Sequence, residues 1–321
     1  MIHTINLGSN VESVIQPEDL KSQVLENVWL ELIDPTEDEL RAVSDASDLP
    51  INFLRLPKTE GYVNLRLEQA YGIINFPVMQ DVTSTKKAYP IVMSFSKNFL
   101  ITVAKKEIQP IIAFAKERMS KTKIDPPAQV TFFIIDEIVA NHYAQIEKLE
   151  SLTAKMEEEV VEKTSSDILK KIFKLKSNMI SFNKILWYER GLVFNLKKCE
   201  SNCMAAKARF LFDTTHEELT RQVDIVETYR EILSDAINVH LSAISNKINL
   251  SIKALTIVIF YLTIVTTVTS FPNTVATFFG ISQFGNTNII IIIAGLLVSI
   301  ILPLIWLWKK NWLTSKRLEY A

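Results

Sequence analysis

The chain has 321 residues and a net charge of −1, and 48% of its residues are hydrophobic, which suits two domains or one domain with a membrane anchor. All 71 charged residues lie outside residues 254–308, so the rest of the chain is about 27% charged, as in soluble proteins. This division excludes a purely cytosolic enzyme, a disordered chain and a many-helix transporter. The near-neutral charge also gives no reason to expect nucleic acid as a partner.

Residues 1–126 are predicted to form a mixed α/β domain. Strands are expected at 27–33, 62–68 and 71–78, and a hairpin at 90–95 and 98–103. Thr36 and Glu39 form a Thr-x-x-Glu capping box that opens a helix to residue 46. The sequence shows no glycine-rich phosphate loop, no His/Cys metal cluster and no nucleophile–base pair, so we do not expect an enzyme.

Residues 127–251 read as helix almost throughout. Two amphipathic stretches, 134–162 and 168–198, precede a long segment at 214–253 whose apolar stripe leads without a break into a hydrophobic stretch. We therefore predict an antiparallel helical layer packed on a stalk helix.

The uncharged stretch fits two membrane spans, at 252–279 and 289–308, joined by an outer loop at 280–288. The loop contains no basic residue, whereas both ends of the pair of spans are flanked by basic residues: Lys247, Lys253, Lys309, Lys310, Lys316 and Arg317. The positive-inside rule then places both chain ends, including the basic tail at 309–321, in the cytoplasm. The prediction is a multi-pass protein of the cell membrane (inner or plasma), in contact with the lipid bilayer.

The first span has a polar stripe in a heptad frame that runs from residue 249 to residue 280. Seven of the ten frame positions are Asn, Ser or Thr, and two are Ile; the stripe contains Asn249, Ile252, Thr256, Ile259, Thr263, Thr266, Ser270, Asn273, Thr277 and Gly280. The positions between them are mostly apolar. Whether the heptad frame continues unchanged beyond Pro272 is left open by the sequence, because proline removes a backbone hydrogen bond and can kink a helix.

Two interpretations of this stripe compete. Small hydroxyl residues allow close helix packing within a membrane. Alternatively, the stripe faces water and lines a pore, which the two asparagines favour because a buried carboxamide needs several partners. One helix cannot enclose a pore, so this second interpretation requires a cyclic homo-oligomer. Neutral oxygen ligands suit hard cations such as Mg²⁺.

The whole chain resembles the CorA family of divalent-metal transporters. The most specific stretch runs over residues 226–256, with Val226-Glu227-Thr228-Tyr229-Arg230 at its start, and Trp29-Leu30-Glu31-Leu32-Ile33-Asp34-Pro35 also fits. The resemblance implies a funnel-shaped homopentamer with an α+β cytoplasmic domain, a long stalk helix and two C-terminal transmembrane helices. It also implies passive transport of Mg²⁺, and often of Co²⁺ and Ni²⁺.

The outer mouth departs from the family pattern. Gly280, Ile281 and Ser282 stand where the family has Gly-Met-Asn, and Asn286 and Asn288 in the loop are candidates to assist them. The loop also lacks acidic residues. This departure leaves a non-conducting metal-sensing pentamer and a ZntB-like zinc transporter open as alternatives.

Family members can carry regulatory metal sites between subunits. The resemblance therefore implies Mg²⁺ both as substrate and as a regulatory ligand, with no covalent cofactor. Asp213, Glu217 and Glu218 lie in the matching part of the stalk, and the competing interpretation is a solvated acidic helix end.

Overall fold

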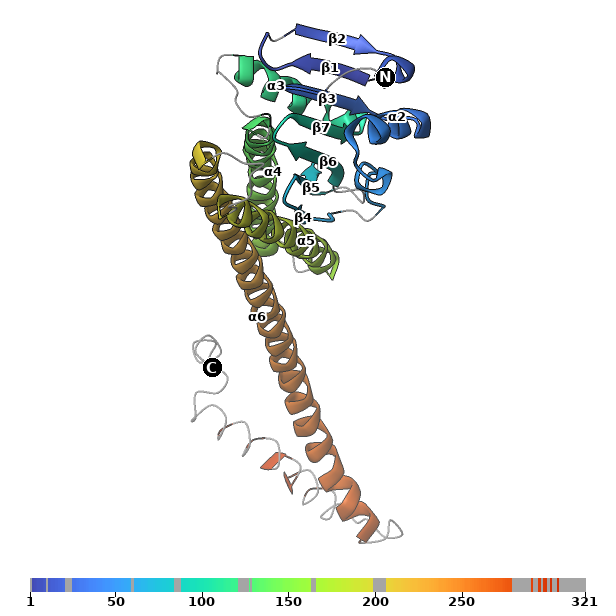
Figure 1. Cartoon of the computed structure of the whole chain (residues 1–321). Helices are drawn as coiled ribbons and strands as arrows, with labels where there is room; N and C mark the ends of the chain where they lie inside the picture. The colour runs from blue at the N-terminus through green and yellow to red at the C-terminus, as the bar shows by residue number, and fades with distance from the viewer. Residues whose placement is uncertain are drawn as a thin grey trace. The chain divides into compact units, whose positions relative to one another are not determined.

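The computed structural model describes residues 2–9, 11–20, 25–58, 61–83, 88–120, 127, 129–162, 166–198 and 206–278, together with 290, 294, 295, 297, 298, 301 and 305. Two compact units can be distinguished, Met1–Leu241 and Ser242–Ala321. The first contains a seven-stranded sheet and a layer of long helices (Figure 1).

The sheet has the strand order β2-β1-β3-β7-β6-β5-β4. Its strands are β1 (Ile2–Asn6), β2 (Val11–Ile15), β3 (Val28–Ile33), β4 (Asn64–Leu67), β5 (Tyr71–Met79), β6 (Ala88–Ser96) and β7 (Phe99–Ala104). β3 and β7 pair in parallel, and all other neighbours are antiparallel. The predicted strands are confirmed, with β4 shorter than expected, whereas β1 and β2 were not predicted.

Alternating side chains give the sheet two buried faces. On β3, Trp29 belongs to one hydrophobic cluster while Leu30 and Leu32 belong to the other. Helices α1 (Pro17–Leu20) and α2 (Glu37–Ser47) cover the second face. The predicted capping box is present, because Thr36 Oγ1 accepts from the Glu39 amide and the Glu39 carboxylate accepts from the Thr36 amide.

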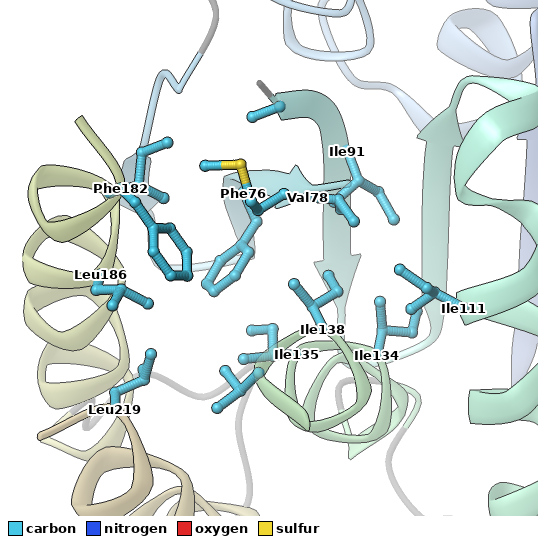
Figure 2. Close-up of a cluster of buried hydrophobic side chains, with 14 of the residues drawn as sticks. Phe76, Val78, Ile91, Ile111, Ile134, Ile135, Ile138, Phe182, Leu186 and Leu219 are labelled. Atoms are coloured by element: carbon cyan, nitrogen blue, oxygen red, sulfur yellow. The ribbon is translucent and has the colours of Figure 1, made fainter. Parts of the chain in front are cut away.

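The first face packs against helices. It is covered by α3 (Gln109–Ser120), which the sequence analysis missed, and by α4 (Gln129–Glu162). In Figure 2, Phe76 of β5 and Ile135 of α4 lie in one cluster with Phe182 of α5 (Ser166–Lys197) and Leu219 of α6 (Ala206–Phe278). This shared core makes the sheet and the beginning of α6 one folded body.

Polar contacts fix the direction of the helical layer. Between α5 and α6, Lys197 meets Asp213, Asn183 donates to Glu227 and Lys176 donates to Ser234. The α5 numbers fall as the α6 numbers rise, so these two helices are antiparallel. The predicted antiparallel layer on a stalk helix is therefore confirmed.

A buried polar cluster joins all three long helices. Gln222 of α6 donates from Nε2 to the Val139 carbonyl (2.9 Å), which turns its Oε1 toward Nδ1 of His142 on α4 (3.1 Å). Nδ1 must therefore carry the hydrogen, and the bare Nε2 faces Oε2 of Glu189 on α5 at 3.7 Å. Burial raises the pKa of Glu189 well above its usual value and lowers that of His142 to about 4. Burial thus disfavours the charged form of both side chains.

Candidate functional site

The C-terminal part of α6 is the candidate site. Among its described side chains from residue 242 onward, none is buried. Large apolar side chains, including Leu250, Leu255 and Leu262, are more than half exposed. Phe210–Ser270 is the one described helix segment whose length and composition suit a membrane crossing, with a mean hydropathy of 2.0 in its most apolar window. Such a surface requires lipid or other protein around it.

The predicted polar stripe lies on this helix, and its described side chains are exposed. They are Asn249, Ile252, Thr256, Ile259, Thr263, Thr266, Ser270, Asn273 and Thr277. α6 runs as one helix through position 272 to Phe278, so its backbone stays helical across the point that the sequence analysis left open. Thr274, just beyond this position, donates to the Ser270 carbonyl at 2.8 Å, as expected for intact helix.

Threonines on the stripe bond back to their own helix. Thr256 donates to the Ile252 carbonyl and Thr263 to that of Ile259, both at 2.8 Å, and Thr277 donates to that of Asn273 at 2.7 Å. Each of these bonds uses the hydroxyl hydrogen and leaves oxygen lone pairs to accept from outside. The stripe therefore presents acceptor oxygens, to which the carboxamides of Asn249 and Asn273 add.

Neighbouring threonines provide an internal comparison. Thr266 and Thr267 both donate to the carbonyl of Thr263, at 3.0 and 2.7 Å. Only Thr266 belongs to the heptad frame. Both hydroxyls thus donate to the same carbonyl. The two side chains differ only in the direction in which they leave the helix.

Other predicted site residues lie outside the described residues. They are the outer-mouth residues Gly280, Ile281, Ser282, Asn286 and Asn288. The basic tail at 309–321 and most of the predicted second span also lie there. Within that span, the described Ile290, Leu297, Val298, Ile301 and Ile305 are exposed.

The three stalk carboxylates predicted to bind metal have different surroundings. Asp213 forms an ion pair with Lys197 at 2.5 Å, and Glu218 accepts from the Tyr143 hydroxyl, whereas Glu217 is exposed. The described residues contain no group of three or more His, Cys, Asp or Glu side chains able to hold a metal ion. The three carboxylates therefore do not make a metal site within one chain. Lys197 was missed by the sequence analysis, because its pairing with Asp213 depends on the α5–α6 register.

Comparison with known proteins gives consistent results. A family model described as "CorA-like Mg2+ transporter protein" matches residues 25–310. The Cobalt/magnesium transport protein CorA of Methanocaldococcus jannaschii is 21% identical over 314 residues, covering 93% of this chain and 96% of that protein. The protein of the same name from Thermotoga maritima is 28% identical over 127 residues, and this match spans only 36% of that relative.

Solved structures agree on the fold. The complete CorA magnesium transporter of M. jannaschii superposes with a TM-score of 0.73 at 18% identity, covering 98% of this chain and 99% of that chain. The ZntB cytoplasmic domain of Vibrio parahaemolyticus gives a TM-score of 0.61 at 12% identity, covering 76% of this chain and 98% of that domain. The predicted CorA-like fold of the chain, a mixed sheet with long helices, is confirmed.

Proposed function

Since the chain belongs to the CorA-like Mg²⁺ transporter family, we propose that it is a homopentameric channel that conducts divalent cations passively, Mg²⁺ first among them. The observation that carries this proposal is the exposed row of acceptor oxygens on a helix whose other exposed side chains are mainly apolar. The predicted topology puts residues 1–251 and the basic tail in the cytoplasm, on the evidence of the flanking lysines.

The chemistry of the stripe suits a hydrated cation. Mg²⁺ gives up its water reluctantly, and the hydrogens of that water point outward from the ion. The oxygens of Thr256, Thr263 and Asn273 can accept those hydrogens, because the two hydroxyl hydrogens are already bound to helix carbonyls. An anion would need donors, which these threonines do not offer. Five copies around an axis would repeat this lining as successive oxygen rings.

A second candidate function is zinc transport, which the likeness to the ZntB cytoplasmic domain favours. That likeness is confined to the fold of the cytoplasmic part. The stripe contains no His, Cys, Asp or Glu, the side chains that usually bind Zn²⁺ in proteins. Oxygen-only lining therefore favours hydrated Mg²⁺ over Zn²⁺.

Uptake into proteoliposomes separates these functions. The purified chain is tested with Mg²⁺, Co²⁺, Ni²⁺ and Zn²⁺, with and without a proton gradient. Mg²⁺ uptake that needs no proton gradient is the expected result, and zinc uptake that follows the gradient would replace it with the second candidate. Absence of flux from a folded oligomer would refute transport and favour a metal-sensing scaffold whose Gly280-Ile281-Ser282 mouth does not conduct.

Regulation by metal is a further part of the proposal. Because one chain gathers no metal site among its described residues, we assign the regulatory Mg²⁺ to the junction of two copies, with Asp213, Glu217 and Glu218 supplying part of its ligands. Lys197 competes for Asp213 through its ion pair. Millimolar Mg²⁺ should raise the melting temperature of the oligomer, Asp213→Ala with Glu217→Ala should weaken this rise, and Lys197→Met should enlarge it. A melting temperature independent of Mg²⁺ in all three proteins would contradict the assignment.

A further inference from the structure

Helix α5 has a second apolar face that its own chain does not cover. Phe173, Ile180, Trp187 and Phe194 follow one another at intervals of seven residues, and they are 57%, 48%, 53% and 37% exposed. Tyr188, next to Trp187, is 51% exposed. A spacing of seven places large side chains in one row along a helix, the pattern of a helix–helix seam.

The other side of α5 is already occupied. Ile172, Met179, Phe182 and Leu186 are buried in the core between α4, α6 and the sheet. The helix is thus apolar on two faces, and such helices are normally buried on both. The exposed row is too regular to be scattered surface residues, so a partner is expected on it.

Charge indicates what kind of partner fits. α5 holds seven Lys or Arg and two Asp or Glu, and one of these two is the buried Glu189. Three of its cations, Lys171, Lys176 and Lys197, contact α4 or α6 of the same chain, which leaves four, including Lys184 and Arg190. Cations lie over the exposed rings: Arg190 is 3.9 Å from the Trp187 centroid and Lys198 is 4.1 Å from that of Phe194. The face is therefore a basic aromatic surface, and its complement must be acidic with some apolar area.

The same chain supplies such a complement on another helix. α4 holds eight Asp or Glu and two Lys or Arg. Four of its glutamates are exposed, namely Glu147, Glu150, Glu157 and Glu158, and the exposed Tyr143 and Val161 flank them. The helical layer is thus basic on one exposed helix and acidic on another.

We propose that the basic aromatic face of α5 docks on the acidic face of α4 in a second copy of this chain. Pairing α5 with α5 would oppose like charges, so a two-fold contact is disfavoured. A contact between two different faces is head-to-tail. Copies joined in this way close into a ring when the rotation between neighbouring copies allows. The existence of a ring rests on the proposed function, and this inference adds the two surfaces that would form the contact between its subunits.

Photo-crosslinking tests the contact in the full-length protein. A benzoylphenylalanine in place of Trp187 keeps an aromatic group at this exposed position. We expect crosslinked chains whose joined peptides map to residues 143–161 of the other copy, unchanged in yield after tenfold dilution. Crosslinks from α5 to α5, to lipid only or to a foreign protein would each overturn the proposal, as would the absence of crosslinks.

Charge reversal gives a second test. Lys184→Glu with Arg190→Glu should lower the oligomeric fraction in native mass spectrometry at least tenfold, and Glu147→Lys with Glu157→Lys should restore it in the combined variant. Phe114→Glu, at a 58% exposed position on α3, is the matched control for a new surface charge and should leave assembly intact. Loss of assembly without rescue would contradict the α4–α5 pairing. Failure of transport in an assembled wild-type ring would instead contradict the proposed function.

Discussion

The two ends of helix α6 differ in where their side chains find partners. Between residues 206 and 241, Phe212, Leu219, Val226 and Leu233 are buried in a core shared with the sheet and α5. From residue 242 to 278, no described side chain is buried. One uninterrupted helix therefore serves two surroundings, the core of its own chain and a membrane or neighbouring copies.

This difference divides the expected effects of mutation. In the first region a substitution changes the free energy of unfolding of the chain, because intrachain contacts hold that region together. In the second region the same kind of substitution should leave that free energy almost unchanged, because no described side chain there is buried. Its effects should appear in flux or in assembly.

The largest expected effect belongs to the second region. Thr266→Val removes a stripe oxygen in every copy and keeps the side-chain shape, so Mg²⁺ uptake should fall at least tenfold. Thr267→Val is the matched control, because its hydroxyl binds the same Thr263 carbonyl but lies off the heptad frame. Proteoliposome flux and melting temperature are measured for both. Equal flux in the two variants would favour simple helix packing as the role of the stripe.

The compact unit that includes the first region, Met1–Leu241, should respond in stability. Lys116 Nζ lies 2.5 Å from Oε2 of Glu31, whose side chain is 5% exposed, and burial of the remaining charge after Lys116→Met should cost about 3–5 kcal/mol. Lys148→Met breaks the exposed pair with Asp81 and should cost less than about 1 kcal/mol. Chemical denaturation compares the two. Similar losses would mean that burial of Glu31 is unimportant.

Glu189→Gln should stabilise the helical layer at high pH. The folded pKa of Glu189 is raised, so wild type loses stability as pH rises above the ordinary carboxyl pKa. His142, with its pKa lowered to about 4, acts oppositely and costs stability as pH falls from 6.5 to about 4. Glutamine at position 189 removes only the first effect. The free energy of unfolding of the variant should therefore exceed that of wild type by an amount that grows from pH 5 to pH 8, to about 1–3 kcal/mol.

Thermal denaturation at several pH values measures this difference. The exposed Glu157→Gln is the control and should follow wild type at every pH. A Glu189→Gln advantage independent of pH would show that Glu189 is ionised in the folded chain throughout this range.

Regular patterns made much of the fold predictable from sequence. Alternation of apolar and polar residues predicted β4, and the Thr36 capping box predicted α2. β2 was missed because it is an exposed edge strand, whose side chains show no buried face. Neither residues 2–6 nor residues 11–15 show the strict apolar–polar alternation that marked β4.

Contacts between elements far apart in the sequence were harder to predict than the elements themselves. The stripe on α6 was visible as a heptad frame, because it lies within one helix. The Lys197–Asp213 ion pair and the His142–Glu189–Gln222 cluster depend on how three helices align, which no local pattern encodes. The seven-residue spacing of the exposed row on α5 was also present in the sequence. Only the structure shows that the opposite face of α5 is buried within its own chain.

The smallest expected effect is at helix α2, which lies in the same compact unit as the first region. Thr36→Ala removes the side-chain acceptor for the Glu39 amide and should cost about 1 kcal/mol. Thr36→Ser keeps the acceptor and is the control. Because the cap lies in the α/β domain, far along the chain from residue 242, denaturation should shift while Mg²⁺ flux through the folded oligomer stays at the wild-type level. A flux change in the alanine variant, absent in the serine variant, would mean that the stability of α2 reaches the membrane helix, and the division between the two regions would then fail.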